Sequence, residues 1–185
     1  IYSAALDSAQ TEIEAIMEKG IQYGKLSPEK AEEAKGRLFF SSSLEKAAEE
    51  AELIIEAVPE KEQIKRAVFE TIEQYAKADC YFATNTSTMS PTEIASYANR
   101  PEKTIAMHFF NPVHKMPLVE IVKGLETSDE TVAVVKDVAE KMGKETVVIN
   151  EFPGFVTSRI SCLVGNEAFY SCRSLTSISI PNSIT

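Results

Sequence analysis

Glycine is scarce in this chain of 185 residues: there are 7, about half of the roughly 7% that proteins contain on average. The chain is therefore neither collagen-like nor a glycine-rich low-complexity segment. No two of the glycines have the spacing of G-x-G-x-x-G or G-x-x-x-x-G-K-[ST], the two loops whose backbone amides hold phosphates. Neither glycine-rich phosphate loop is present in these residues.

Cysteine, basic charge and long apolar runs are also limited. Cys80, Cys162 and Cys172 are odd in number and lack the spacing of a metal site, so we expect reduced thiols and a cytoplasmic protein. The net charge is −9, which argues against a nucleic-acid partner because phosphate binding depends on clustered Lys and Arg. The uncharged stretches are shorter than the roughly 20 apolar residues that cross a bilayer, and no signal-peptide pattern opens the sequence. We therefore expect neither nucleic acid nor a membrane as a partner.

The segments that are present alternate between two kinds of apolar pattern. Residues 53–58 are too short and too apolar for anything but a buried strand, whereas Ile64, Val68, Phe69 and Ile72 mark one face of a helix. Further strands are predicted at 37–40, 80–84, 104–107, 118–122 and 146–149, and further helices at 2–19, 29–35, 44–50, 129–142 and 156–170. This alternation predicts an α/β fold with a mostly parallel sheet covered by helices on both faces.

Four polar residues fall at predicted strand ends, where ligands bind in such sheets: Ser87, His108, Asn111 and Glu120. A histidine with a carboxylate on the neighbouring strand is the minimum set for general base catalysis. Glu120 lies within Leu-Val-Glu-Ile-Val, where a buried unpaired charge would be costly, so a partner is expected. Two structural interpretations stay open: a satisfied structural histidine, and a glutamate that faces solvent.

Other chemistries are less well supported by the residues. A serine hydrolase built on Ser87 and His108 lacks an acidic third member and an oxyanion loop. His108 and His114 flank Pro112 on an irregular segment, which is not a metal signature, and no metal is expected. Glu60 and Lys65 begin the helix after 53–58, where charged residues are usually solvated. Asn85 has a stronger claim, because an amide at a strand end can bind a ribose or nicotinamide edge.

A set of short motifs in one order marks a family. They are Ile54–Val58 with Pro59-Glu60, Asn85-Thr86-Ser87, His108–Pro112, Leu118–Ile121 and Pro153-Gly154-Phe155-Val156. The chain resembles the L-3-hydroxyacyl-coenzyme A dehydrogenases, in particular the bacterial 3-hydroxybutyryl-CoA dehydrogenases, from about residue 5 to residue 170. The resemblance implies a truncated Rossmann-like NAD-binding domain and an enzyme of fatty-acid or butyrate metabolism with an acyl-CoA substrate.

The resemblance also implies roles for individual residues. His108 would be the general base, Glu120 would orient it, and Ser87 would bind the substrate oxygen near the cofactor, with Asn111 at the same site. The residues matching cofactor-binding positions of the family are Glu60, Lys65, Asn85, Ser87 and Asn111, and the cofactor is NAD. Where the family usually has Asn, this chain has Ser158, whose shorter side chain changes that contact.

Three regions are expected along the chain: a truncated dinucleotide-binding domain over 1–150, the start of a helical substrate and dimerisation domain over 151–170, and a Ser/Thr-rich tail over 171–185 that resembles a leucine-rich repeat. The glycine-rich strand–turn–helix unit that opens the family is absent, so we expect a fragment of a homodimeric parent, inactive and weak in NAD binding by itself. The alternative is a non-catalytic interaction module, derived from a degenerate dehydrogenase domain and fused to surface leucine-rich repeats.

Overall fold

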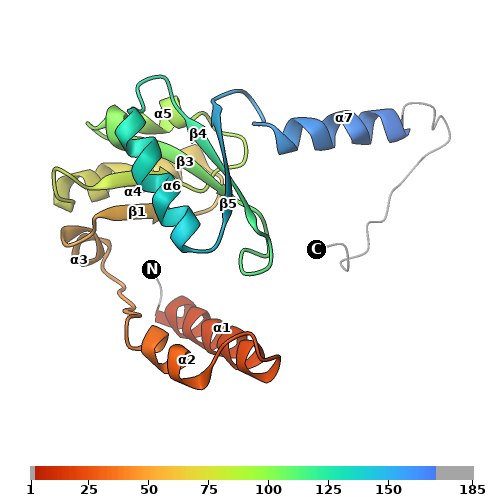
Figure 1. Ribbon diagram of the computed structural model, residues 1–185. Helices are drawn as coiled ribbons and strands as arrows, with labels where there is room; N and C mark the ends of the chain where they lie inside the picture. Colours follow the sequence, from red (N-terminus) through yellow and green to blue (C-terminus); the bar gives the residue numbers. More distant parts are fainter. Residues whose placement is uncertain (1–2, 170–185) are drawn as a thin grey trace. The chain divides into compact units, whose positions relative to one another are not determined.

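The computed structural model describes residues 3–169, and the side chains of residues 4–163 (Figure 1). The chain divides into two compact units, Ile1–Glu50 and Ala51–Thr185. The tail predicted at 171–185 lies outside the described residues, and the predicted domain boundary near residue 150 stays a prediction.

The first unit contains three helices: α1 (Ser3–Gln22), α2 (Pro28–Lys35) and α3 (Leu44–Glu49). Ser27 caps α2 by accepting a hydrogen bond from the Lys30 amide, and Pro28 stands at the first helical position, where its missing N–H does no harm. Ser43 caps α3 in the same way. The three predicted helices of this unit are therefore confirmed, and their caps set where two of them begin.

The strand predicted at 37–40 is wrong. After α2 the backbone turns, and residues 38–40 form no strand. Leu38, Phe39 and Phe40 are exposed to 40%, 90% and 40%. A strand needs a paired neighbour for its backbone groups, and the described residues of the first unit contain no strand with which this apolar segment could pair.

The second unit is built on a five-stranded sheet in the order β1-β2-β3-β4-β5. The strands are β1 (Leu53–Glu56), β2 (Tyr81–Thr84), β3 (Thr104–Phe109), β4 (Leu118–Lys123) and β5 (Glu145–Asn150). All neighbouring pairs are parallel except β3 and β4, which are antiparallel. The helices are α4 (Glu62–Tyr75), α5 (Pro91–Ala95), α6 (Asp129–Lys141) and α7 (Thr157–Phe169), with a 3-10 turn at Pro101–Lys103. The α/β fold with a mostly parallel sheet is confirmed.

Helices cover both faces of this sheet (Figure 1). On one face, Met107 and Ile121 pack with Val135 of α6. On the other, Phe69 of α4 meets Phe82 of β2 edge-on, with ring centroids 5.8 Å apart. Because side chains alternate between the faces of a strand, the neighbours of Met107 and Ile121 in sequence, His108 and Glu120, lie on the face opposite α6.

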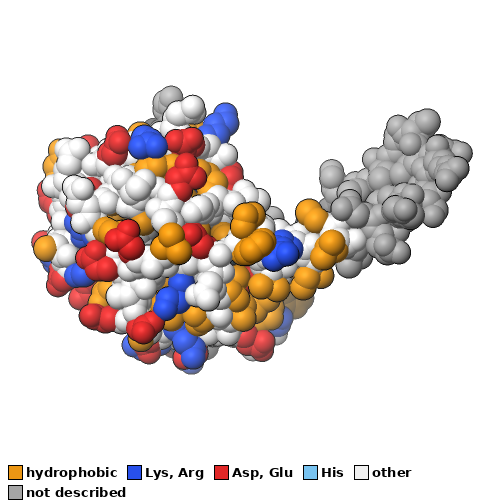
Figure 2. All heavy atoms as spheres, turned by 90° about the horizontal axis from the view of Figure 1, so that it is seen from above, with side chains coloured by type: hydrophobic (Ala, Val, Ile, Leu, Met, Phe, Trp, Pro, Cys, Tyr) orange, Lys and Arg blue, Asp and Glu red, His pale blue; other side chains and the backbone are white. Residues whose placement is uncertain are grey.

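Two further observations concern the charges on the surface and the length of the helices. Figure 2 shows acidic and basic side chains interspersed on the face that it presents. Among the described residues, no helix has the length and apolar character that crossing a membrane requires.

Candidate active site

His108 and Glu120 are directly opposite each other on two strands. The antiparallel register of β3 and β4 pairs the two residues, and His108 Nδ1 lies 2.7 Å from Glu120 Oε2. Both side chains are buried, His108 to 6% exposure and Glu120 to none. The partner expected for Glu120 is therefore His108, and a buried carboxylate at this distance fixes the orientation of the imidazole.

Glu120 is held by a third element as well. The backbone N–H of Thr157, the first residue of α7, donates to Glu120 Oε1 at 3.0 Å, and the Thr157 hydroxyl donates to Oε2 at 3.1 Å. The imidazole of His108 lies against two aromatic rings, with centroids 4.5 Å away for Phe110 and 5.7 Å for Phe155. Both oxygens of the carboxylate thus have hydrogen-bond partners, and aromatic rings restrict the histidine.

A second buried carboxylate lies at the end of β1. Glu56 is 4% exposed, and both of its oxygens lie 3.0 Å from Lys65 Nζ. Its oxygens also accept from the Val58 amide at 2.6 Å and the Thr84 hydroxyl at 2.7 Å. Lys65 is completely buried, so this ion pair joins β1, β2 and α4 in the interior.

Glu60 extends this cluster to the turn after β2. Its Oε2 lies 3.2 Å from Lys65 Nζ, and its Oε1 accepts from the Thr86 hydroxyl and, at 3.1 Å, from the Ser87 amide. Partial burial raises the pKa of Glu60, but the bonds from Thr86 and Ser87 and the charge of Lys65 outweigh it and hold the pKa below its ordinary value. The ionised carboxylate thereby fixes the turn that carries Ser87, and Ser87 is exposed to solvent.

The remaining predicted residues lie around the same edge of the sheet. Asn85 follows β2, and its Oδ1 accepts from the Phe109 amide at 3.0 Å, which ties the ends of β2 and β3 together. Asn111 is exposed in the loop after β3. Ser158 is half-buried in the first turn of α7, where the neighbouring Thr157 makes the bonds to Glu120.

Most of the chain matches a known family in sequence. The sequence profile described as "3-hydroxyacyl-CoA dehydrogenase, NAD binding domain" matches residues 1–152. The chain belongs to this family. The resemblance inferred from the motifs is confirmed, and NAD is the cofactor that the family name specifies.

Sequence and structure comparisons agree with this assignment to the 3-hydroxyacyl-CoA dehydrogenases. The chain is 43% identical over 147 residues to the probable 3-hydroxybutyryl-CoA dehydrogenase of Bacillus subtilis, covering 80% of this chain and 51% of that protein. It is 42% identical over 160 residues to the fatty acid oxidation complex subunit alpha of Psychrobacter arcticus, covering 86% of this chain and 22% of that protein. The solved structure of (S)-3-hydroxybutyryl-CoA dehydrogenase from Ralstonia eutropha matches with a TM-score of 0.88 at 34% identity, covering 91% of this chain and 59% of that one.

The chain thus spans between about a fifth and three fifths of the length of these dehydrogenase relatives. The polar groups after β1 and β2 fit NAD, because the Glu60 carboxylate can accept, and the Asn85 amide nitrogen and the hydroxyl of exposed Ser87 can donate, hydrogen bonds to its amide and hydroxyl groups. Lys65 is different from the other predicted cofactor residues. Its ammonium is buried and lies against the carboxylates of Glu56 and Glu60, so any effect on a cofactor passes through Glu60.

Reasoning from the sequence assigned no role to three residues that contact the predicted site residues: Glu56, Phe155 and Thr157. Glu56 carried the same signal as Glu120, a charge within an apolar strand, but was not singled out. Phe155 was part of the motif Pro153-Gly154-Phe155-Val156 without a role of its own, and Thr157 gave no signal, because the contacts of both depend on the path of the chain between β5 and α7. Two residues there have positive φ, Gly154 at 76° and Phe155 at 47°.

Proposed function

We propose that this chain provides the NAD-binding half and the general base of an enzyme that oxidises (S)-3-hydroxyacyl-CoA to 3-ketoacyl-CoA, or catalyses the reverse reduction. The observation that carries the proposal is the 2.7 Å contact between His108 and Glu120. A hydroxyl oxidation requires one group to take the hydroxyl proton, and a histidine backed by a buried carboxylate is suited to that role.

The geometry divides the proton transfer between two residues. Because Nδ1 of His108 is engaged by Glu120, Nε2 is the ring atom that takes the proton from the 3-hydroxyl. The negative charge of Glu120 stabilises the imidazolium that results, and the bonds from Thr157 keep that charge in place. NAD, when bound, supplies the acceptor for the hydride from C3. In the reduction, His108 returns its proton to the ketone oxygen.

The neighbouring residues orient the reactants. Ser87 binds the substrate oxygen next to the nicotinamide, and Glu60 holds the Ser87 amide and hence the turn. Asn111 and Ser158 lie on two further segments of the same edge and complete the polar contacts to substrate. Lys65 keeps Glu60 ionised and oriented.

The wider setting follows from the names of the relatives. A 3-hydroxybutyryl-CoA dehydrogenase and a fatty acid oxidation subunit are among them, so we infer a role in fatty-acid or butyrate metabolism. We further propose a cytoplasmic protein, from its few cysteines, and a homodimer at full length, from the family resemblance. The alternative of a non-catalytic module has no support from the fold or the relatives, and the tail that suggested it lies outside the described residues.

A chimera tests the proposal. Residues 51–163 replace the aligned segment of the Bacillus subtilis relative, and reduction of acetoacetyl-CoA is followed by the loss of NADH absorbance. We expect turnover within about tenfold of the unmodified relative, since the transplanted segment carries the base, its partner and the cofactor contacts. A chimera that folds and binds NADH but turns over no acetoacetyl-CoA would contradict the proposal.

A further inference from the structure

Two residues around the start of α7 contact the pair of His108 and Glu120, called the dyad below: Phe155 in the segment before the helix and Thr157 at its first position. Phe155 packs on the His108 ring, and Thr157 bonds Glu120. A bulky residue with positive φ is strained, and such strain persists only where the surroundings over-determine the conformation. At Phe155, where φ is 47°, something must therefore hold this segment, residues 152–156, at each end.

The far end is held by Glu151. Its Oε2 accepts from the Ser90 hydroxyl at 2.9 Å and from the Thr92 amide at 3.1 Å, and its Oε1 accepts from the Thr92 hydroxyl at 2.7 Å. Its own amide donates to the Lys123 carbonyl at 2.9 Å. One half-buried carboxylate thus joins the start of α5 to the end of β5.

The start of α5 is a firm anchor for this carboxylate. Ser90 caps α5 through the Glu93 amide, and the Thr92 hydroxyl also accepts from the Leu125 amide at 2.7 Å. Gly124 packs so closely on Thr92 that an added Cβ would lie 3.0 Å from its hydroxyl oxygen. The carboxylate therefore connects residues 152–156 to a point that is fixed from two sides.

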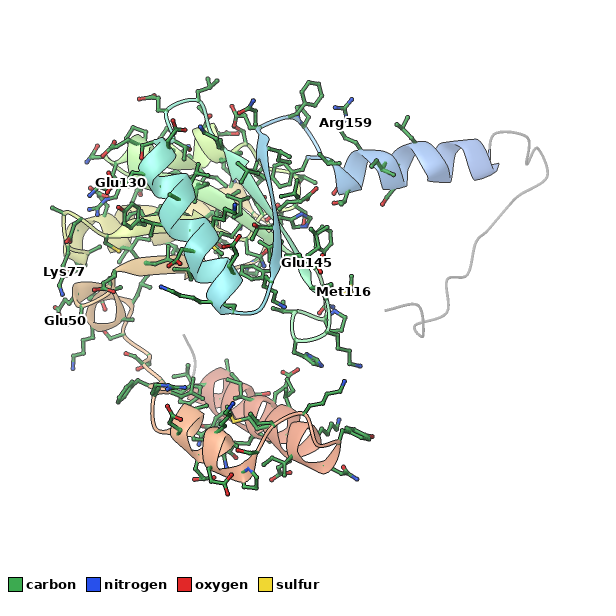
Figure 3. The ribbon with its side chains drawn as sticks, viewed as in Figure 1. Glu50, Lys77, Met116, Glu130, Glu145 and Arg159 are labelled. Carbon is green, nitrogen blue, oxygen red and sulfur yellow. The ribbon has the colours of Figure 1, made fainter. Side chains whose placement is uncertain are left out.

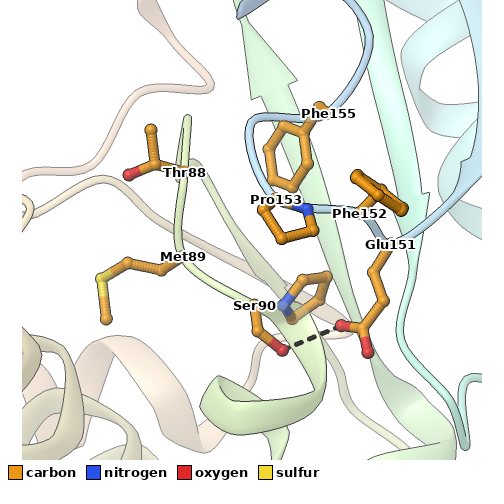
Figure 4. A pocket seen from close by; sticks show the side chains of 8 residues that line it. Thr88, Met89, Ser90, Glu151, Phe152, Pro153 and Phe155 are labelled. Carbon is orange, nitrogen blue, oxygen red and sulfur yellow. Dashed lines mark hydrogen bonds between the residues drawn. The ribbon is translucent and has the colours of Figure 1, made fainter. Parts of the chain in front are cut away.

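Figure 4 shows this arrangement: Glu151 points from the end of β5 to Ser90, while Pro153 and Phe155 lie beyond it on the same segment. A cavity of about 280 Å³ lies between the two sides, lined by residues 88–91 and by 151–153 with Phe155. Phe155 itself is buried against Ala106 and Val122, whereas open space lies beside residues 151–153. At that end of the segment the bonds of Glu151 supply a restraint that packing does not.

We propose that Glu151 is a positioning residue for the dyad: by tying residues 152–156 to α5, it holds Thr157 against Glu120 and Phe155 against His108. The catalytic meaning of this inference rests on the proposed function, since it assumes that His108 is the base. The geometric claim does not, and it can be tested without substrate or cofactor.

The amide of Thr157 is the natural probe. Amides in the first turn of a helix have no partner within the helix, so protection of Thr157 from hydrogen exchange reports its bond to Glu120. The measurement is amide exchange by NMR on the 185-residue chain, with the amides of Met107 and Ile121 in β3 and β4 reporting the stability of the sheet. We expect Glu151→Ala to speed exchange at Thr157 by roughly tenfold or more while the sheet amides change less than about twofold.

Three further variants sharpen the test. Glu145→Ala changes the exposed first residue of β5, the strand that Glu151 follows (Figure 3), and should leave the exchange rate of the Thr157 amide unchanged. Glu151→Gln keeps one acceptor oxygen and should give an intermediate rate. Thr92→Val removes one donor from the far side and should raise exchange at Thr157 less than Glu151→Ala does.

Two results would overturn the inference. One is equal loss of protection at Thr157 and in the sheet, or failure of both Glu151→Ala and Thr92→Val to fold, because Glu151 would then serve general stability. The other is unchanged exchange at Thr157 in folded Glu151→Ala. If the exchange result holds while the chimera shows no dehydrogenase activity, the positioning of the dyad stands and the proposed function fails.

Discussion

Two buried carboxylates, Glu56 at the end of β1 and Glu120 on β4, look alike in several respects. Each interrupts an apolar strand, with exposures of 4% and 0%. Each accepts hydrogen bonds from a side chain on a neighbouring strand and from a backbone amide outside the sheet. Burial of a charge is tolerated in both places because every oxygen has a partner.

The partners make the difference. Glu56 faces Lys65, an ammonium with no exposed surface that also lies 3.2 Å from Glu60. Glu120 faces His108, an imidazole whose nitrogens can accept or donate a hydrogen bond and whose ring lies near the rings of Phe110 and Phe155. The first pair joins structural elements in the interior, and the second places a carboxylate beside a side chain of the type that serves as a general base. Burial alone therefore does not identify a catalytic carboxylate, whereas the chemistry of its partner does.

Removing the cation of the first pair should have the largest effect on folding. Lys65→Met leaves Glu56 buried without its counter-charge, and breaking a buried pair from one side costs about 3–5 kcal/mol, a large part of the stability of a typical domain. Urea unfolding followed by circular dichroism measures the free energy of unfolding of the variant and the wild type.

Lys61→Met is the matched control, since Lys61 is an exposed lysine one turn earlier and should change stability by less than about 0.5 kcal/mol. Adding Glu56→Gln to Lys65→Met should restore part of the loss, because the unpaired charge is removed. Equal effects of Lys65→Met and Lys61→Met would mean that the ion pair has no structural role.

The second pair should behave in the opposite way. His108→Gln in the chimera with the Bacillus subtilis relative should lower kcat by roughly 10² to 10⁴, the range of general base catalysis, and change unfolding by less than about 1 kcal/mol, because Gln can still donate to Glu120. His114→Gln, at the exposed histidine of the loop after β3, should leave kcat unchanged. A loss below about tenfold for His108→Gln would exclude His108 as the base.

The sequence was sufficient for the second pair because two local facts agreed. Leu-Val-Glu-Ile-Val required a partner for Glu120, and the predicted strands brought His108 to a neighbouring strand end. The same reasoning applied to Leu-Ile-Ile-Glu would have found Glu56, whose partner Lys65 is nine residues later on the following helix. The strands and helices of the second unit were likewise predicted from the spacing of their apolar residues.

Other features depend on contacts that no local pattern specifies. The apolar residues 38–40 have a strand-like composition but pair with no strand in the first unit, and a strand exists only when it is paired. The contact of Thr157 with Glu120 depends on positive φ at Gly154 and at Phe155; the glycine allows this easily, but nothing in the sequence announces it for a phenylalanine. The family resemblance indicated Ser158, which is one residue from Thr157, the side chain that bonds Glu120.

Glu60 is linked both to the structural ion pair and to the predicted site. It shares Lys65 with Glu56, and it also fixes the turn at Ser87. Its pKa in the folded chain is below the ordinary 4.5, so its stabilising contribution is complete above about pH 4.5 and is lost as the pH falls through the folded-state pKa. Glu60→Gln should therefore lower stability at pH 7 and show a flatter dependence on pH below 4.5. About a third of the side chain is exposed, so solvent screening keeps the difference below about 1 kcal/mol. Urea unfolding at pH 7 and at about pH 3 measures it, and an equal difference between variant and wild type at both pH values would show that the ionised carboxylate contributes nothing to holding the turn.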